Sequence, residues 1–211
     1  MDRFEVSLPK SAQYFLTYVY PQIEKQQWFK GGYLVPVEAT NNEMAKLIDQ
    51  YSSIDYWNLQ TNIGIRGLAS RVQYNSNFDT FTVRKERIET GARTEFEKLS
   101  NAIQNNWLYP YWFCQAYIYL KPYCYLNSIA ICKTNDLIEY ICNGVENIDW
   151  KIRTTYDKGA ADFYAVPWDL NSALRLGLQN NFESHYEIRK WSFNKVKKKP
   201  QSILDFLEEN A

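Results

Sequence analysis

The chain has 211 residues, with 24 Lys and Arg against 24 Asp and Glu, so its formal net charge is zero. This length fits one domain with a real core, and we expect a single domain over residues 1–211. The balanced charge excludes a global field that would draw the chain onto nucleic acid or an anionic membrane, so any basic surface must be local. Aromatic residues make up 17% of the chain, which fits a thick aromatic core or a surface that stacks on flat groups.

The cysteines and the N-terminus give two further exclusions. The four cysteines form no CxxC pair, and the single His185 lies far along the chain from them, so a zinc site is not expected. Most of the cysteines lie inside apolar runs, where a free thiol behaves as a small hydrophobic group, and we predict reduced core residues. Residues 1–20 contain no long apolar run, which predicts neither a signal peptide nor a membrane span. We therefore expect a cytoplasmic protein without a membrane partner.

The first part of the chain predicts helices around one short extended segment. Residues 10–30 are helical in part, with Pro21 as a break or a turn. Residues 31–39 are extended after a Gly-Gly pair. Residues 41–53 predict a helix with one buried stripe formed by Met44, Leu47 and Ile48.

Residues 64–87 predict a β-hairpin with a polar face. Apolar and polar residues alternate in both halves, and residues 75–79 between them have turn chemistry. The apolar set is Leu68, Val72, Tyr74, Phe81 and Val83. The polar set is Arg71, Gln73, Thr82 and Arg84. If both apolar halves meet the same core, the polar set shares the opposite face of the sheet.

The second half of the chain predicts an alternation of helices and strands. Residues 91–106 form an amphipathic helix that buries Phe96, Leu99 and Ile103. Residues 111–120 and 125–132 are nearly all apolar, as expected of strands covered on both faces. A helix over 134–144, a strand over 162–168 and a basic loop with a short terminal helix over 193–211 follow. This pattern indicates an α/β (α+β) domain with a mixed central sheet flanked by helices, whose core spans about residues 35–172.

The residues that could carry chemistry are acids. The chain has no phosphate-binding loop and none of the common hydrolase motifs. Four acids precede the first long strand: Glu38, Glu43, Asp49 and Asp55. Carboxylates hold Mg²⁺ in phosphodiester-cleaving sites, where the cation neutralises the scissile phosphate and lowers the pKa of the attacking water. The alternative for Asp55 is a cap on a strand or turn.

The order of elements from residue 35 to 172 is a helix with acids, SSIDYW, the hairpin, the helix GARTEFEKL, the strand YWFCQAYIYL and the strand and helix LNSIAICKTNDLIEYI. This order resembles the PD-(D/E)xK, or restriction-endonuclease-like, superfamily, and FYAVPWDL is similar to the last strand of many such domains. The resemblance implies a restriction-endonuclease-like core, with Asp55 as a metal ligand and Glu43, or Glu38, as the helix acid. It also implies DNA as the partner and a homodimer that cuts both strands.

The family's acid and lysine, at positions i and i+2 of the next strand, are missing from this sequence. The chain offers Arg71-Val72-Gln73 or Gln73-Tyr74-Asn75 instead. The resemblance then makes Gln73 a neutral oxygen ligand. It makes Lys85, on the paired strand, the family's lysine if the strand register differs from the alternation above and turns the Lys85 side chain inward. The expected catalytic set is Asp55, Gln73, Glu43 and Lys85, and Asp55, Gln73 and Glu43 are the expected Mg²⁺ ligands.

The hairpin also concentrates basic side chains. The expected nucleic-acid contacts are Arg66, Arg71, Arg84, Arg87 and Arg93. Guanidinium groups bind phosphate oxygens through two parallel hydrogen bonds, so this surface could hold a nucleic-acid backbone whether or not it cuts. The alternative is that these arginines pair with Glu86, Glu89, Glu95 and Glu97 as an ordinary solvated surface.

Two functional hypotheses follow. The first is a nucleic-acid-binding protein with a restriction-endonuclease-like core that acts, if active, as a Mg²⁺-dependent DNA endonuclease. The second is a catalytically inactive interaction module of the same fold, which binds a protein partner through its aromatic-rich surface. The missing lysine favours the second hypothesis, and the clustering of acids favours the first.

Overall fold

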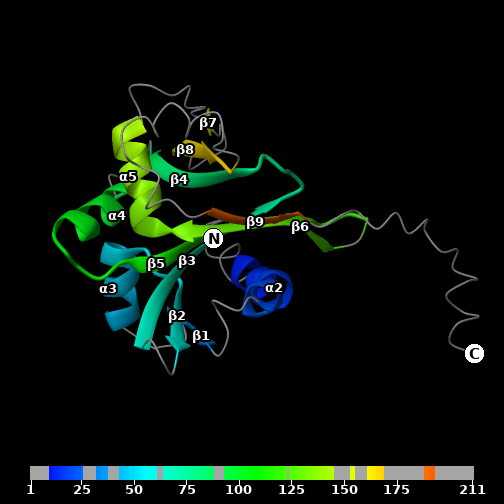
Figure 1. The fold of residues 1–211 in the computed structure, drawn as a ribbon, viewed down its shortest axis with the longest axis horizontal. Coiled ribbons are helices and arrows are strands. Elements are labelled where there is room, and N and C mark those ends of the chain that lie inside the picture. The colour runs from blue at the N-terminus through cyan, green and yellow to red at the C-terminus, as the bar shows by residue number, and fades with distance from the viewer. Residues whose placement is uncertain are drawn as a thin grey trace, which may run out of the picture.

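The computed structural model describes most of the chain up to residue 144 and three short segments beyond it. The described residues are 10–25, 32–37, 43–60, 64–87, 93–122, 124–144, 153–154, 161–168 and 188–192. They form two β-sheets, with helices on both sides of the larger one (Figure 1), which confirms the expected α/β class and mixed central sheet. The predicted C-terminal loop and helix, residues 193–211, lie outside the described residues.

The larger sheet has six strands in the order β1-β2-β3-β5-β6-β9. These strands are β1 (Gly32–Pro36), β2 (Tyr56–Gln60), β3 (Gly64–Tyr74), β5 (Pro110–Tyr119), β6 (Tyr125–Lys133) and β9 (Ile188–Ser192). β3 and β5 run parallel, and every other neighbouring pair runs antiparallel. β3 pairs with β2 through residues 64–68 and with β5 through residues 67–74.

The smaller sheet is where the sequence prediction was wrong. β4 (Thr80–Arg87) pairs with β8 (Ala161–Pro167), and β8 pairs with β7 (Arg153–Thr154), so β3 and β4 form no hairpin. The segment between β3 and β4 does turn, because Asn75 and Asp79 have positive φ angles of 52° and 46°. β4 continues into a second layer on one side of the central sheet (Figure 1), where Phe81 and Val83 enter the core beneath it.

The helices lie on both sides of the central sheet. They are the π-helix η1 (Phe15–Val19), α2 (Tyr20–Glu24), α3 (Glu43–Ser52), α4 (Glu95–Gln104) and α5 (Thr134–Gly144). α4 and α5 lie on the same side as β4 and β8, and α2 lies on the other side (Figure 1). No helix in the described ranges has the length and apolar character needed to cross a membrane.

The predicted helix positions are confirmed more fully at α4 than at α3. Thr94 caps α4 in a capping box: its side chain accepts from the Glu97 backbone N–H, and the Glu97 side chain accepts from the Thr94 backbone N–H. Leu99 is buried as expected. In α3 the predicted buried stripe is wrong at Leu47, which is 50% exposed.

Two hydrophobic cores lie on opposite faces of the central sheet. Successive residues of β5 alternate between them, since Trp112, Cys114, Ala116 and Ile118 enter the core beneath η1 and α2, while Phe113 and Tyr117 enter the core beneath β4, α4 and α5. Every residue from Trp112 to Ile118 is buried, which confirms the predicted strand with two covered faces. The predicted apolar set of residues 64–87 is divided between the cores: Leu68 and Val72 face the first, and Phe81 and Val83 the second.

Candidate functional site

Asp55 lies directly before β2, which is an inner strand of the central sheet. Its Oδ2 accepts hydrogen bonds from the Ser70 backbone N at 2.5 Å and from Ser70 Oγ at 3.2 Å. β2 begins at Tyr56, which pairs with Leu68, so no residue of β2 lies opposite Ser70. The Asp55 carboxylate therefore supplies the acceptor that a longer β2 would have supplied, which is the capping alternative considered from the sequence.

Gln73 lies on the opposite face of the sheet from the Asp55–Ser70 contact. Ser70 and Gln73 are three residues apart on β3, so their side chains leave opposite faces. Gln73 Nε2 donates to Thr82 Oγ1 of β4 at 3.4 Å, on the side of the second core. The structure does not bring together Asp55 and Gln73, the pair that was expected to share one Mg²⁺ ion.

The positions of β3 that share a face with the Asp55–Ser70 contact carry no metal chemistry. Besides the apolar Leu68 and Tyr74, they are Ser70 and Val72, separated by the i, i+2 spacing at which the family has an acid and a lysine. Neither an alcohol nor an aliphatic side chain replaces a carboxylate or an ammonium group.

Within the described ranges, the other expected acids form no metal-binding group with Asp55. Glu43 is exposed at the start of α3. Glu38 lies outside the described residues, as does the side chain of Asp49. Within the described ranges, no three His, Cys, Asp or Glu side chains are grouped so that they could hold a metal ion. Lys85 is half-buried, with Nζ 5.6 Å from the centre of the Tyr164 ring.

Arg71 and Arg84 point into the space between the two sheets. The Arg71 guanidinium forms an ion pair with Glu95 of α4, and both side chains are mostly buried, at 18% and 16% exposure. Glu95 Oε2 also accepts from the Arg84 backbone N at 3.0 Å. The two guanidinium groups lie 5.2 and 5.7 Å from the centre of the Phe163 ring of β8. Glu95 was one of the acids considered as an arginine partner, and the pairing is internal.

Three neighbouring side chains from β5 and α4 satisfy the free edge of β4. The N–H groups of Thr80, Thr82 and Arg84 donate to the Tyr117 hydroxyl at 3.4 Å, Gln115 Oε1 at 3.2 Å and Glu95 Oε2 at 3.0 Å. A strand edge left open would invite pairing with another chain. The polar set predicted for a solvent-facing surface is thus part of the packing between layers.

We call this group the interlayer cluster. Its members are Arg71, Gln73, Thr82, Arg84, Glu95 and Gln115. The sequence reasoning missed Gln115, although a signal was present: it is the one strongly polar residue in the apolar run YWFCQAYIYL, and a buried amide needs hydrogen-bond partners. Gln115 Nε2, Gln73 Oε1 and Arg71 Nε are buried without a partner.

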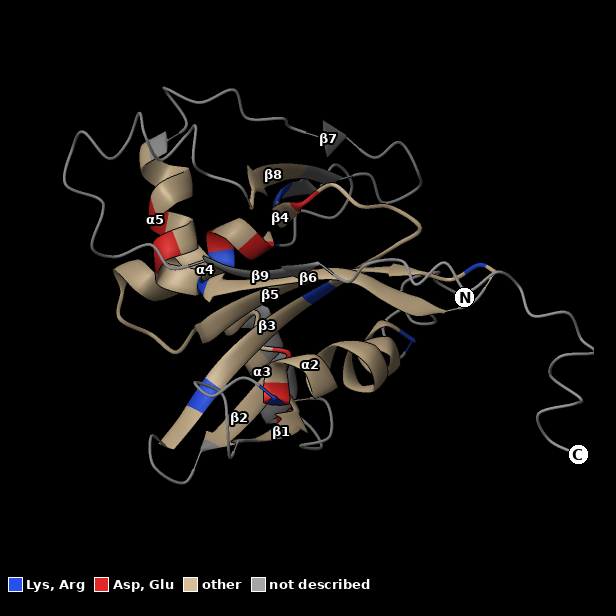
Figure 2. Ribbon diagram, turned by 45° about the vertical axis from the view of Figure 1, so that its right-hand side comes forward, with Lys and Arg blue, Asp and Glu red and all other residues tan. Residues whose placement is uncertain are grey.

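Three other cations lie on tyrosine rings, and one of them is Lys85 on Tyr164, described above. Arg66 lies 4.0 Å from the centre of the Tyr111 ring, and Arg93 lies 5.5 Å from that of Tyr51. In the part of the chain that the structure describes, Arg66, Lys85 and Arg93 form no ion pair. Figure 2 shows basic positions along β3 and also on other elements, with the acidic positions mainly on the helices. The side chain of Arg87 lies outside the described residues.

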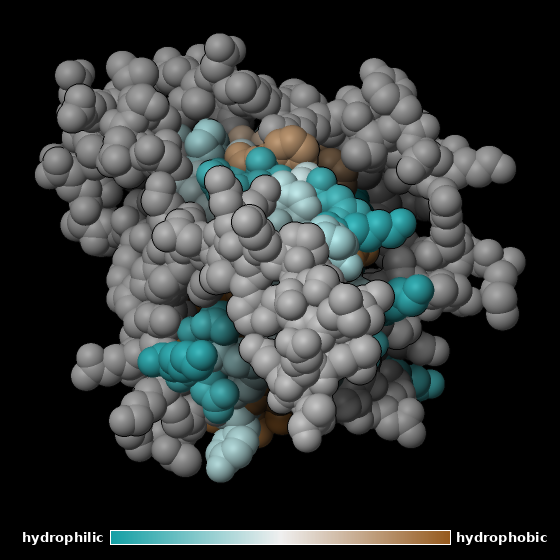
Figure 3. Space-filling view, turned by 90° about the vertical axis from the view of Figure 1, so that its right-hand side faces the viewer, coloured by the Kyte–Doolittle hydropathy of each residue, from teal (hydrophilic) through white to brown (hydrophobic). Residues whose placement is uncertain are grey.

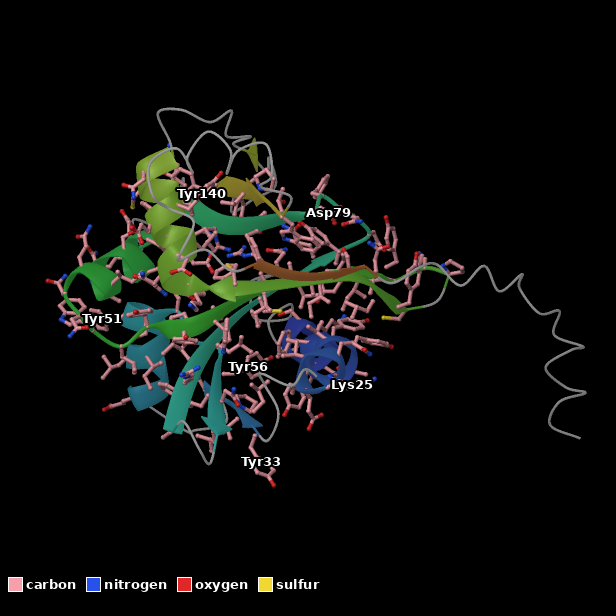
Figure 4. All side chains as sticks on the ribbon, in the orientation of Figure 1. Lys25, Tyr33, Tyr51, Tyr56, Asp79 and Tyr140 are labelled. Carbon is pink, nitrogen blue, oxygen red and sulfur yellow. The ribbon has the colours of Figure 1, made fainter. Side chains whose placement is uncertain are left out.

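An exposed apolar row crosses the first three strands of the central sheet. We define the apolar row as Tyr33, Leu59 and Ile65, which are direct cross-strand partners in β1, β2 and β3. Their exposures are 73%, 36% and 69%. Tyr33 points away from the rest of the described structure (Figure 4). By contrast, the described side chains on the face in Figure 3 are mainly hydrophilic.

Comparisons with known proteins leave the family undecided. No family model, curated protein or solved structure matches this chain. The restriction-endonuclease-like resemblance therefore rests on the element order alone.

Proposed function

We propose that this chain is a nucleic-acid-binding domain with a restriction-endonuclease-like core, and that its Asp55 position does not cleave phosphodiester bonds. The element order around Asp55 supports the core: Asp55 precedes the β2–β3 hairpin, α4 follows, and β5 returns parallel to β3. This hairpin, rather than the one expected between β3 and β4, is the counterpart of the family's active-site hairpin.

The observation that carries the binding proposal is the stacking of Arg66 on Tyr111. An arginine stacked on a ring keeps the edge of its guanidinium available, and that edge can bind a phosphate oxygen. Arg66 is half-buried, and its charge is not neutralised by an acid within the described ranges. Arg93 over Tyr51 repeats this chemistry at an exposed position. Paired cations and aromatic rings suit single-stranded nucleic acid, in which bases are free to stack while phosphates meet positive charge.

The residues around Asp55 argue against cleavage. The carboxylate is occupied by Ser70, and the facing positions of β3 are Ser70 and Val72. A Mg²⁺-assisted cleavage site needs further oxygen ligands to fix the ion against the scissile phosphate.

Binding is tested by fluorescence anisotropy with a labelled single-stranded oligonucleotide and a duplex of equal length. The variant Arg66→Gln/Arg93→Gln removes the two stacked cations, and the control Lys25→Gln/Lys121→Gln removes two charges at exposed lysines elsewhere. We expect at least a tenfold loss of affinity for the single strand in the arginine variant, about 1.4 kcal/mol. The slope of log affinity against log salt concentration should also become shallower by roughly one unit for each phosphate that is no longer bound. Equal losses in both variants, or no binding by the wild type, would overturn the proposal.

The absence of cleavage at Asp55 is tested in the same preparations. Calorimetric titration with Mn²⁺ should give no heat of binding that depends on Asp55. Incubation of duplex and single-stranded substrates with Mg²⁺ should give no cleavage product that depends on Asp55. Cleavage that requires Mg²⁺ and is lost in Asp55→Asn would restore the nuclease hypothesis.

The apolar row favours a second function, the binding of a protein partner by a catalytically inactive module. Clustered apolar side chains on a monomer surface often mark interaction sites. The test compares proteins captured from source-cell lysate by the wild type, by Tyr33→Ser/Ile65→Thr and by the control Trp107→Ser/Leu108→Thr, whose residues are 51% and 52% exposed. We expect a partner that only the row variant loses. Identical capture by the wild type and both variants would exclude this second function.

A further inference from the structure

We draw no further inference here: the strongest candidate, the interlayer cluster between the central sheet and β4, contains buried polar atoms of Arg71, Gln73 and Gln115 that lack partners, but these atoms are enclosed by protein and nothing in the described residues shows a space in which a ligand would meet them.

Discussion

At the residue scale, Asp55 and Glu95 have the same role: each accepts a hydrogen bond from the backbone N–H of a strand residue. Asp55 accepts from Ser70 of β3, and Glu95 accepts from Arg84 of β4. A carboxylate in this role forms a charge-assisted hydrogen bond, which is roughly twice as strong as a neutral one. The same residue type that suits a Mg²⁺ ligand therefore suits the end of a strand, and its position along the sequence does not separate the two roles.

Glu95 should contribute to the stability of the described structure through two hydrogen bonds. It accepts from both the Arg71 guanidinium and the Arg84 backbone N–H. We expect Glu95→Ala to lower the free energy of unfolding by about 2 kcal/mol, because it leaves two donors without an acceptor. Arg71→Met should cost less, since it removes one of these bonds together with the unpartnered Nε. Urea unfolding followed by tryptophan fluorescence measures both changes.

The matched control for this prediction is Glu139→Ala. Glu139 is exposed on α5, and loss of its carboxylate should change stability by no more than about 0.5 kcal/mol. If Glu95→Ala behaved like Glu139→Ala, the hydrogen bonds of Glu95 to Arg71 and Arg84 would contribute nothing measurable to stability.

Sequence patterns identified many of the important residues here but not their partners. The alternation in residues 67–74 correctly separated Leu68 and Val72 from Arg71 and Gln73. It could not reveal that Glu95 would pair with Arg71, and the alternation in β4 could not reveal that Gln115 would bind Thr82, because those contacts span 24 and 33 positions of the chain. Local periodicity shows which side of a strand is apolar, whereas the identity of the opposing layer depends on the whole topology.

At the element scale, β4 shows why strand prediction succeeded and strand pairing failed. The alternation in residues 80–87 predicted a strand correctly, and turn residues before it suggested the nearest strand as its partner. β3, however, pairs with β2 and β5, and β4 finds its partner in β8, far along the chain. Sequence proximity alone does not show whether the chain after a turn stays in the same sheet or enters another layer.

The side-chain acceptors along β4 can be tested one position at a time. Gln115→Leu removes the acceptor of the Thr82 N–H, so we expect a loss of about 1–3 kcal/mol. Native-state hydrogen exchange should show a faster Thr82 amide, while the Phe81 and Val83 amides, which alternate toward β8, keep their protection.

Thr82→Val is the matched control for this exchange experiment. It removes the Thr82 hydroxyl, which also donates to Gln115 Oε1, but it keeps the backbone N–H and its acceptor. The residue 82 amide should therefore remain protected in that variant. Uniformly faster exchange along β4 in Gln115→Leu would mean that the whole strand loosens and that Gln115 is not a local cap.

At the scale of the whole molecule, the two cores are joined by the strands they share. β5 and β6 send alternate residues to both sides, so loss of packing on one face removes support from the other. Cys114 and Cys132 sample the two cores separately: Cys114 lies in the core beneath η1 and α2, and Cys132 in the core beneath β4. Both are fully buried, as predicted, whereas Cys142 is exposed, contrary to the prediction of a core residue.

These thiols can report whether the molecule unfolds as one unit. Burial raises the pKa of the Cys114 thiol, and burial together with the nearby Asp136 raises that of Cys132, so neither should react in the native state at neutral pH. In a Cys124→Ser/Cys142→Ser background, Cys132→Ala leaves Cys114 as the reporter, and Cys114→Ala leaves Cys132.

We expect each reporter to become reactive at the same urea concentration at which tryptophan fluorescence of that variant changes, because coupled cores lose their packing in one transition. Each variant provides its own reference, so any stability lost through the alanine substitution shifts both signals together. A reporter that reacts well below the fluorescence midpoint would show that its layer opens alone. If Cys132 did so, the interlayer cluster would be too weak to hold β4 and β8 onto the central sheet. The predicted contribution of Glu95 to stability would then be wrong as well.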